Sequence, residues 1–368
     1  MWNARWKPPT STEPTGTVRF LLPPRAPRHP GRVSVVQEET PHSLGESMTR
    51  SAKTILAVLA LAGAVTARGA VGHRVLHVTV NGTTIAVAVW YPADGDEHAV
   101  TYGSARVPGR AAVDAPVKSG PWPLVVFAHG YSGSGSGSAF LGERAAAAGY
   151  VWAAPDYTDA VTEVRLEGRP TGDLRGALKD LREKPPSLKN HGHRVDQTRA
   201  VLDMLLGAPD FPIDRDRVAL AGHSLGGWTA VHTARADARV RALVLYSMGE
   251  LNYLFKRQHI VNGAELARLR APVYLTYGSR EKAALKGREP NTLYTYRHWG
   301  GPACVVEIRG GDHFVYVDPA AAGRHGGTDR QRARIADATA TFLDRVLRGR
   351  SALPPTDQCT DGLSRPPR

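Results

Sequence analysis

A serine in a glycine-rich turn is the residue pattern in this sequence that is best suited to covalent chemistry. The segment Gly222–Gly227 reads GHSLGG, and it lies between the apolar run Val218–Ala221 and a helix-like stretch. The pattern G-x-S-x-G between a strand and a helix holds a serine on a sharp turn, where glycines remove side chains that would collide. The first N–H groups of the helix then face negative charge that develops there. We predict that Ser224 is a nucleophile; the alternative is an incidental serine in a glycine-rich turn.

A base for this serine is expected later in the chain, because this turn goes with the order serine, acid, histidine. Of the 14 histidines, His313 follows both the serine and a late strand-like run, in the segment GGDHF. We predict that His313 accepts the proton of Ser224. His191 and His193 could suggest a metal site, but no carboxylate lies at metal-ligand spacing. We interpret them as a polar pair at the start of a helix.

The acid that would orient His313 has two candidates. Glu281 follows the apolar run Val273–Tyr277, where an acid should emerge from the sheet. Glu250, which follows an earlier strand-like run, is the alternative acid. Asp312 adjoins the histidine, and its side chain is expected to point elsewhere. A glutamate can serve, because the acid has only to hold the imidazole tautomer and stabilise the imidazolium.

Two backbone N–H groups must stabilise the negative oxygen that forms when a serine attacks a carbonyl. Leu225, directly after the nucleophile, supplies one of them. The other is expected from Tyr131, in the loop HGYS that follows the apolar run Leu124–Ala128. The ring of Tyr131 is expected either to wall the acyl pocket or to cap the loop.

The elements that must position these residues alternate along the chain. Asn81-Gly82 joins two runs of alternating apolar and polar residues, which predicts a β-hairpin. Strands and helices then alternate, which predicts a mostly parallel sheet covered by helices on both faces, with the hairpin as an antiparallel edge. The predicted later strands are Val151–Ala154, Val218–Ala221, Val240–Tyr246, Val273–Tyr277 and Cys304–Ile308, and the predicted helices are Ala139–Ala148, His193–Leu206 and Asp329–Leu347.

Composition excludes several classes of protein. The 368 residues are 22% charged and 42% hydrophobic, as in ordinary globular chains. The formal net charge is +13, but the basic residues are dispersed, so the charge alone does not indicate a nucleic-acid partner. No uncharged apolar stretch is long enough to span a membrane. Two cysteines are too few for a disulfide scaffold, a four-cysteine zinc site or an iron–sulfur cluster.

The N-terminal region reads differently from the rest. Residues 1–47 are proline-rich and lack an apolar period, so we interpret them as a disordered extension or a gene-start artefact. Residues 48–67 have the layout of a signal peptide: a short positive segment after Met48, the apolar run Thr54–Val65, and small residues at a cleavage site. Translation is therefore expected to start at Met48 and the mature protein to be secreted.

The remaining chain is predicted to be one catalytic domain, residues 68–350, with a tail at 351–368. Residues 157–189 are a charged, proline-containing insertion, which is either a solvated loop or a partial lid. Cys304 lies in a strand-like run and Cys359 in the polar tail. In an oxidising compartment the two are expected to pair and to tie the tail to the domain.

Together these features resemble a secreted α/β-hydrolase, over roughly residues 73–348. The resemblance is to the dienelactone-hydrolase-like and platelet-activating-factor-acetylhydrolase-like esterases, with bacterial cutinases and polyester hydrolases nearby. Serine stands here where true dienelactone hydrolases have a cysteine, and Glu281 stands where the family acid is normally an aspartate. The segments that carry the resemblance are Trp90–Ala93 (WYPA), Val126–Gly130 (VFAHG), Asp196 on its helix, Gly222–Gly227 and Gly311–Phe314 (GDHF).

The resemblance implies an α/β-hydrolase fold and a serine-dependent carboxylic ester hydrolase that works through an acyl-enzyme. The substrate would be a small-molecule, lipid or polyester ester, and no metal or organic cofactor is needed. We expect a monomer without a nucleic-acid partner. One alternative is a catalytically weak binding protein on the same fold. Another is a dinucleotide-binding oxidoreductase, because Gly133–Gly137 and Asp156 imitate a dinucleotide-binding fingerprint.

Overall fold

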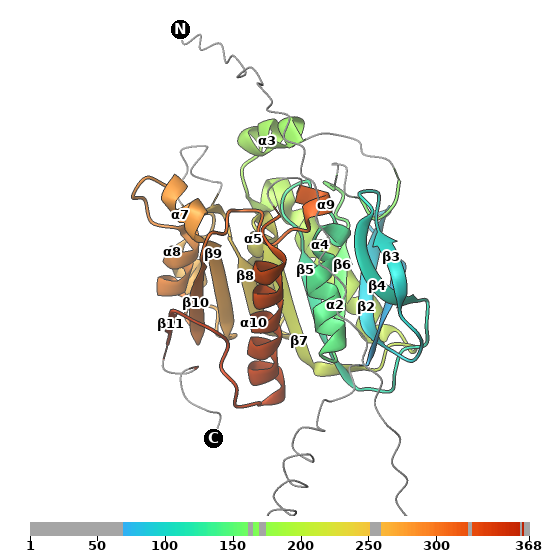
Figure 1. Cartoon of the computed structure of the whole chain (residues 1–368). Helices are drawn as coiled ribbons and strands as arrows, with labels where there is room; N and C mark the ends of the chain where they lie inside the picture. Colours follow the sequence, from blue (N-terminus) through green and yellow to red (C-terminus); the bar gives the residue numbers. More distant parts are fainter. Residues whose placement is uncertain are drawn as a thin grey trace, which may run out of the picture. The chain divides into compact units, whose positions relative to one another are not determined.

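A computed structural model of the chain describes residues 69–160, 165–168, 174–250, 259–322, 326–360 and 363 (Figure 1). The expectations for residues 1–47 and for a signal peptide at 48–67 therefore concern residues outside the described part. Across these described ranges, no helix combines the length and the apolar character needed to cross a membrane.

A single sheet organises the described residues, with its strands in the order β11-β10-β9-β8-β7-β5-β6-β2-β1-β4-β3. The strands from β10 to β6 pair in parallel, and β2 joins β6 antiparallel. The expected mostly parallel sheet is confirmed. The strands are β1 (Ala70–Val80), β2 (Thr83–Ala93), β3 (His98–Tyr102), β4 (Val107–Val113), β5 (Trp122–Ala128), β6 (Val151–Pro155), β7 (Ile213–His223), β8 (Val240–Tyr246), β9 (Val273–Gly278), β10 (Ala303–Ile308) and β11 (Gln358–Cys359).

Helices cover both faces of this sheet (Figure 1). The longest are α4 and α10, and short helices follow several strands. The helices are η1 (Gly135–Ser138), α2 (Ala139–Ala147), α3 (Leu174–Glu183), α4 (Leu188–Gly207), α5 (Leu225–Ala236), α6 (Gly263–Leu266), α7 (Ser279–Ala284), α8 (Asn291–His298), α9 (Pro319–Ala322) and α10 (Asp329–Arg348).

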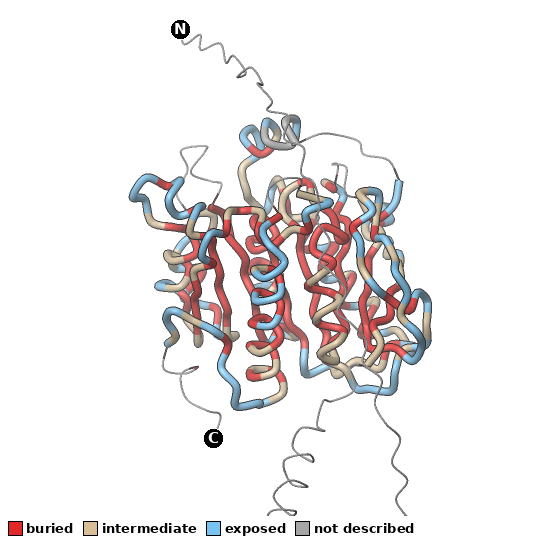
Figure 2. The backbone as a smooth tube through the Cα atoms, in the orientation of Figure 1, coloured by how far each residue is buried: buried red, intermediate tan, exposed pale blue. Residues whose placement is uncertain are grey.

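The buried stretches of the central strands are mainly apolar, and both of their faces are covered (Figure 2). In β5, Val125 and Phe127 pack in one cluster, which includes residues of α2 and α10. Leu124 and Val126 point the other way and pack in a second cluster, which includes residues of α4 and α5. Successive side chains of a strand alternate between faces, so a strand between two helix layers needs apolar residues at every position.

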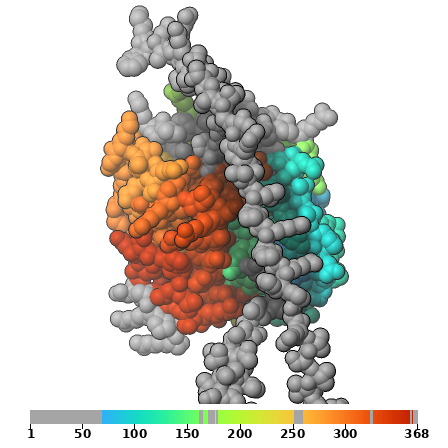
Figure 3. Space-filling model, in the orientation of Figure 1, coloured from blue at the N-terminus to red at the C-terminus, as the bar shows by residue number. Residues whose placement is uncertain are grey.

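The predicted hairpin is present as β1 and β2, which pair antiparallel along their whole lengths. Its turn residues Asn81 and Gly82 have φ of 49° and 78°. Positive φ at both positions is what a two-residue hairpin turn of this kind requires. The hairpin lies near one edge of the sheet, beyond β6. Strands β4 and β3 extend the sheet past the hairpin. These two strands were not predicted, because β4 contains a proline and a glycine and β3 is short. Strands β3 and β11 are the two ends of the strand order, and in the space-filling view the cyan residues and the orange to red residues lie on opposite sides (Figure 3).

Element boundaries differ from the sequence predictions mainly at polar ends. Helix α4 begins at Leu188 rather than His193, because Ser187 caps it by accepting a hydrogen bond from the Asn190 N–H. Strand β7 begins at Ile213 rather than Val218; of the added residues, 214–217 are charged and 215–217 are exposed. Both extensions are invisible to a search for apolar periodicity.

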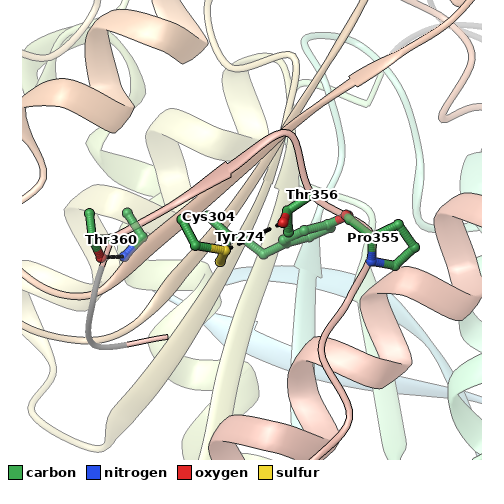
Figure 4. Close-up of a disulfide and its surroundings, with 7 residues drawn as sticks. Tyr274, Cys304, Pro355, Thr356 and Thr360 are labelled. Carbon is green, nitrogen blue, oxygen red and sulfur yellow. Dashed lines mark hydrogen bonds between the residues drawn. A yellow bond between two sulfur atoms is a disulfide. The ribbon is translucent and has the colours of Figure 1, made fainter. Parts of the chain in front are cut away.

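The C-terminal tail is held against β10. The expected disulfide joins Cys304 on β10 to Cys359 on β11, at opposite positions of an antiparallel pair (Figure 4). The Tyr274 hydroxyl donates to the carbonyl oxygen of Pro355 at 2.7 Å, and Thr360 accepts a backbone hydrogen bond from β10 at 2.9 Å. The expected link between tail and domain is therefore present.

Candidate active site

Ser224 lies on the turn between β7 and α5, in a backbone conformation that a non-glycine residue rarely adopts. Its φ is 55° and its ψ is −118°. A Cβ at Gly222 would lie 2.2 Å from the Gly226 carbonyl oxygen, and one at Gly226 would lie 1.9 Å from the Ala128 carbonyl oxygen. Only glycine fits at both positions. The Ser224 N–H donates to the Tyr246 carbonyl oxygen at 2.9 Å, which helps to hold the strained turn.

Glu281 and His313 are brought together from the ends of two neighbouring strands. Glu281 lies in the first turn of α7, directly after β9, and His313 follows β10. The distance between Glu281 Oε1 and His313 Nδ1 is 2.5 Å, and both side chains are buried. The second carboxylate oxygen accepts the Ser247 hydroxyl at 2.6 Å. The carboxylate is thus held through both of its oxygens while it faces the imidazole.

A histidine next to the serine connects this pair to the nucleophile turn. His223 Nε2 lies 2.7 Å from the His313 carbonyl oxygen, and the centroids of the two rings are 4.8 Å apart. Burial, together with the neighbouring His313, lowers the pKa of His223 well below its usual value. A neutral ring whose Nε2 carries the proton can donate to that carbonyl. Because His223 directly precedes Ser224, this bond holds the loop of His313 beside the serine.

Glu250, the alternative acid, has other partners. Its carboxylate is buried and accepts hydrogen bonds from the Asn291 N–H at 2.8 Å and the Thr292 N–H at 2.7 Å. These are the first N–H groups of α8, so Glu250 caps that helix. Burial, and next the charge of Glu281, raises the pKa of Glu250 to about 8. The geometry places Glu281, not Glu250, against His313 Nδ1.

The segments that hold the two predicted oxyanion donors meet at the serine. A Cβ at Gly130 would lie 3.5 Å from the Ser224 Cβ, so the loop after β5 runs against the nucleophile turn. Gly226 in turn lies against the carbonyl of Ala128 at the end of β5. Tyr131 directly follows Gly130, and Leu225 lies between Ser224 and Gly226. The meeting arises because β5 and β7 are parallel neighbours, whose carboxyl ends lie at the same edge of the sheet.

The Tyr131 side chain reaches away from the loop toward the insertion at 157–189. Its hydroxyl donates to Asp180 on α3, and its ring lies edge-on to His191, with centroids 5.7 Å apart. Burial and the nearby Asp180 raise the pKa of the Tyr131 phenol above its usual value. The hydroxyl therefore stays protonated and able to donate.

One histidine of the pair near the start of α4 has a backbone partner. His191 Nε2 lies 3.1 Å from the Lys184 carbonyl oxygen, and burial lowers the pKa of both His191 and His193. In the part of the chain that the structure describes, no group of three or more metal-ligating side chains could hold an ion. Both histidines lie on α4, near its start.

Asp156, the acid of the dinucleotide-like fingerprint, is bound to two backbone N–H groups. Its two carboxylate oxygens accept the N–H groups of Gly135 and Leu166, both at 2.7 Å. A ribose-binding acid must present its oxygens to a ligand. Gly135 is required by packing, since a Cβ there would lie 2.1 Å from the Ala154 carbonyl oxygen.

Sequence reasoning missed two polar residues near this site. Ser247 binds Glu281 as described above, and Arg194 on α4 donates to the loop after β5. Neither belongs to a motif, and Arg194 is one of 47 lysines and arginines in the chain. Its burial, which distinguishes it, arises only in the folded structure.

Comparison with known proteins agrees with the fold. Residues 110–293, half of the chain, match the model of the dienelactone hydrolase family. Platelet-activating factor acetylhydrolase of Cavia porcellus is 26% identical over a stretch that covers 38% of each chain. This chain thus spans less than two fifths of the length of that curated relative.

Solved structures share the fold. A ferulic acid esterase from Streptomyces cinnamoneus has 24% sequence identity and a TM-score of 0.62, over 82% of this chain and 96% of that one. A dienelactone hydrolase-like promiscuous phosphotriesterase from metagenomic libraries has 19% identity and a TM-score of 0.51, over 76% of this chain and 99% of that one. The protein has an α/β-hydrolase fold, and the chain belongs to the dienelactone hydrolase family.

Proposed function

We propose that this protein is a serine-dependent carboxylic ester hydrolase that forms an acyl-enzyme on Ser224. The observation that carries the proposal is the 2.5 Å contact between Glu281 and His313 Nδ1, beside a strained serine turn. A carboxylate on Nδ1 favours the tautomer with its proton there, which leaves Nε2 free to accept the serine proton. Family membership supports hydrolysis in general, and the names of two relatives, an acetylhydrolase and a ferulic acid esterase, support an ester bond as the target.

The first half-reaction transfers the acyl group to the enzyme. His313 Nε2 takes the Ser224 proton while Oγ attacks the ester carbonyl carbon. The N–H groups of Tyr131 and Leu225 stabilise the resulting oxyanion. The tetrahedral intermediate then collapses, the bond to the alcohol oxygen breaks, and His313 gives its proton to that oxygen.

Water completes the cycle. His313 removes a proton from a water molecule while the water oxygen attacks the carbonyl carbon of the acyl-enzyme. A second tetrahedral intermediate forms, and the same two N–H groups stabilise its oxyanion. Its collapse releases the carboxylic acid and returns the proton to Ser224. Glu281 stabilises the imidazolium in both halves without becoming protonated itself.

We also propose that the protein is secreted, after cleavage of a signal peptide that begins at Met48. The Cys304–Cys359 disulfide supports an oxidising compartment. The proposed substrates are small-molecule, lipid or polyester esters. The proposed enzyme is a monomer that needs no metal or organic cofactor.

The test is labelling with a fluorophosphonate, followed by assay on nitrophenyl esters of increasing acyl length. We expect the probe to modify Ser224 in the wild type and not in Ser224→Ala, and we expect His313→Ala to lose labelling and turnover together. Ser351→Ala, which changes an exposed serine in the tail, is the matched control. Full esterase activity in Ser224→Ala would overturn the proposal.

A further inference from the structure

Arg194 is a fully buried arginine whose charge is balanced by one carboxylate. Its Nε and Nη2 atoms each donate to a different oxygen of Asp159 at 2.8 Å, and its side chain is 0% exposed. The guanidinium also lies over the ring of Tyr157, 4.6 Å from its centroid. Burial alone would raise the pKa of Asp159, but Arg194 lowers it below its usual value, so Asp159 stays ionised.

A buried ion pair of this kind is a poor way to stabilise a fold. The loss of hydration offsets most of the attraction, and well-packed apolar residues of similar volume often do as well or better. The remaining donors of Arg194 therefore matter. Nη1 donates to the His129 carbonyl oxygen at 2.7 Å, and Nη2 donates to the Gly130 carbonyl oxygen at 3.1 Å. Both carbonyls belong to the loop that carries the predicted oxyanion donor.

Two further donors converge on the Gly130 carbonyl oxygen. The Gly133 N–H donates to it at 3.1 Å, and His129 Nδ1 lies 2.6 Å from it. His129 Nε2 accepts the Tyr157 N–H at 3.2 Å, so the ring proton is on Nδ1 and points at the carbonyl. Burial, with Arg194 next, lowers the pKa of His129 to about 3, which keeps the ring neutral. The direction of this one carbonyl is fixed by three donors.

Planarity of the peptide bond transfers that direction to Tyr131. The Gly130 carbonyl and the Tyr131 N–H belong to one peptide unit, and the cis bond in the described ranges lies elsewhere, at Gly120-Pro121. In a trans peptide the C=O and the N–H point in opposite directions. With the oxygen held toward Arg194, the Tyr131 N–H must point away from Arg194. Gly130 itself lies against Ser224.

We propose that Arg194, oriented by Asp159, is a positioning residue that aims the Tyr131 N–H into the oxyanion site. The inference rests on the proposed function, because it assigns a residue that supports the same reaction. Without the guanidinium, only the Gly133 N–H and His129 Nδ1 still hold the Gly130 carbonyl, and the His129 carbonyl loses its Arg194 donor, so the peptide is oriented less firmly and the Tyr131 N–H points less accurately at the developing negative charge. The transition state then loses a donor, while the ground-state ester, which carries little charge, is bound much as before.

The test compares Arg194→Lys with the wild type on nitrophenyl acetate. Lysine keeps the charge but loses the planar fork that reaches two carbonyls and one carboxylate together. We expect kcat to fall by about tenfold to a hundredfold, as for a misaimed oxyanion donor, while KM changes by less than about threefold. The rate of fluorophosphonate labelling at Ser224 should fall by a similar factor. The acid limb of the pH profile of kcat/KM should not move, because Glu281 and His313 are untouched.

Arg345→Lys is the matched control, because Arg345 is also a buried arginine that donates to a backbone carbonyl, that of Ser351, but it lies on α10. We expect this variant to lose thermal stability and to keep its kcat. If Arg194→Lys does not fold, Asp159→Asn is the second variant. It keeps Arg194 but removes the charge that orients the guanidinium, and it should show the same selective loss of kcat.

The outcomes separate the two proposals. If the wild type hydrolyses esters and labels at Ser224, but the Arg194 and Asp159 variants keep a wild-type kcat or change KM alone, the role of Arg194 is overturned. An equal loss of kcat in Arg345→Lys overturns it as well. If the wild type neither hydrolyses esters nor labels at Ser224, the proposed function has failed instead.

Discussion

Ser247 donates a 2.6 Å hydrogen bond to Oε2 of Glu281, the carboxylate oxygen opposite the one that faces His313. Ser247 follows β8 and Glu281 follows β9, which are parallel neighbours. Ser247 has a φ of 44° and donates its N–H to the Thr276 carbonyl oxygen at 2.7 Å. The acid is therefore oriented by the end of the adjacent strand as well as by its own helix.

Ser247→Ala should weaken catalysis modestly. A hydrogen bond to a charged group contributes about 1.5–3 kcal/mol, and part of this reaches the transition state through the orientation of Glu281. We expect kcat to fall by about threefold to thirtyfold with KM nearly unchanged. Ser247→Cys, which keeps a weaker donor and adds no β-branch at this positive φ, should recover part of the loss. Wild-type kcat in Ser247→Ala would show that Glu281 needs no second anchor.

The two buried glutamates should respond differently to the same change. Glu281→Gln removes the charge that stabilises the imidazolium, and we expect kcat to fall by at least about a hundredfold. Glu250→Gln, the matched variant, should keep kcat within about threefold because Glu250 binds α8 rather than His313. The measurement is turnover of nitrophenyl acetate by both variants at one pH. The reverse result would make Glu250 the acid and leave the hydrolase proposal standing.

Glu250 should make stability fall as pH rises. Its pKa is raised from 4.5 to about 8 in the folded protein, so between these values the folded state binds more protons than the unfolded state. The free energy of unfolding must then decrease with pH, by at most about 1.4 kcal/mol per unit for one group. Asp318 and Asp156, with pKa values raised to about 7 and about 6, act in the same direction.

The comparison of Glu250→Gln with the wild type isolates the contribution of Glu250. An amide can accept only one of the two N–H groups well, which lowers stability by an amount that does not depend on pH. The stability of the variant relative to the wild type should nevertheless rise between pH 5 and pH 8, since glutamine does not titrate. Urea unfolding at several pH values measures this difference. A constant difference across the range would contradict the prediction.

The features that could be predicted from the sequence are those that depend on the conformation of a few consecutive residues. The serine turn was predictable because Gly222 and Gly226 are required by contacts within and beside the turn itself. The hairpin at Asn81-Gly82 was predictable for the same reason. By contrast, the choice of Glu281 over Glu250 depends on which carboxyl meets His313, and both follow strands at one edge of the sheet.

Arg194 and Ser247 show where prediction from sequence ends. Their partners lie far away in the chain: Arg194 binds a loop that follows β5, and Ser247 binds an acid that follows β9. A buried arginine has no sequence signature, since arginine is usually exposed. Strands β3 and β4 escaped prediction because their pairing, rather than their composition, makes them strands.

The Cys304–Cys359 disulfide should stabilise the domain without affecting catalysis. It closes a loop with a sequence separation of 55, for which the chain-entropy model gives about 4 kcal/mol. Cys359→Ser is the better variant, because Cys304 is in the core. We expect a lower urea midpoint, unchanged kcat at 25 °C, and a wild-type mass two hydrogens lighter than its reduced form. Free thiols at both positions in secreted protein would contradict the pairing.

Tyr131 has two separable connections, because its N–H belongs to the predicted oxyanion site and its hydroxyl binds Asp180 on α3. Tyr131→Phe removes the hydroxyl and keeps the N–H, so kcat on nitrophenyl acetate should stay within about threefold of the wild type. The Asp180 side chain is 38% exposed, so solvent screens the bond, which should contribute less than about 1 kcal/mol to stability. The Tyr131 hydroxyl lowers the pKa of Asp180, so this contribution should be present at neutral pH and lost as the pH falls below the usual range of an aspartate.

Asp180→Asn is the partner variant of Tyr131→Phe. The double variant should lose little more stability than either single variant, since all three remove the same bond. Additive losses would show that the two residues act separately, and a large loss of kcat in Tyr131→Phe would show that the ring hydroxyl takes part in the reaction itself.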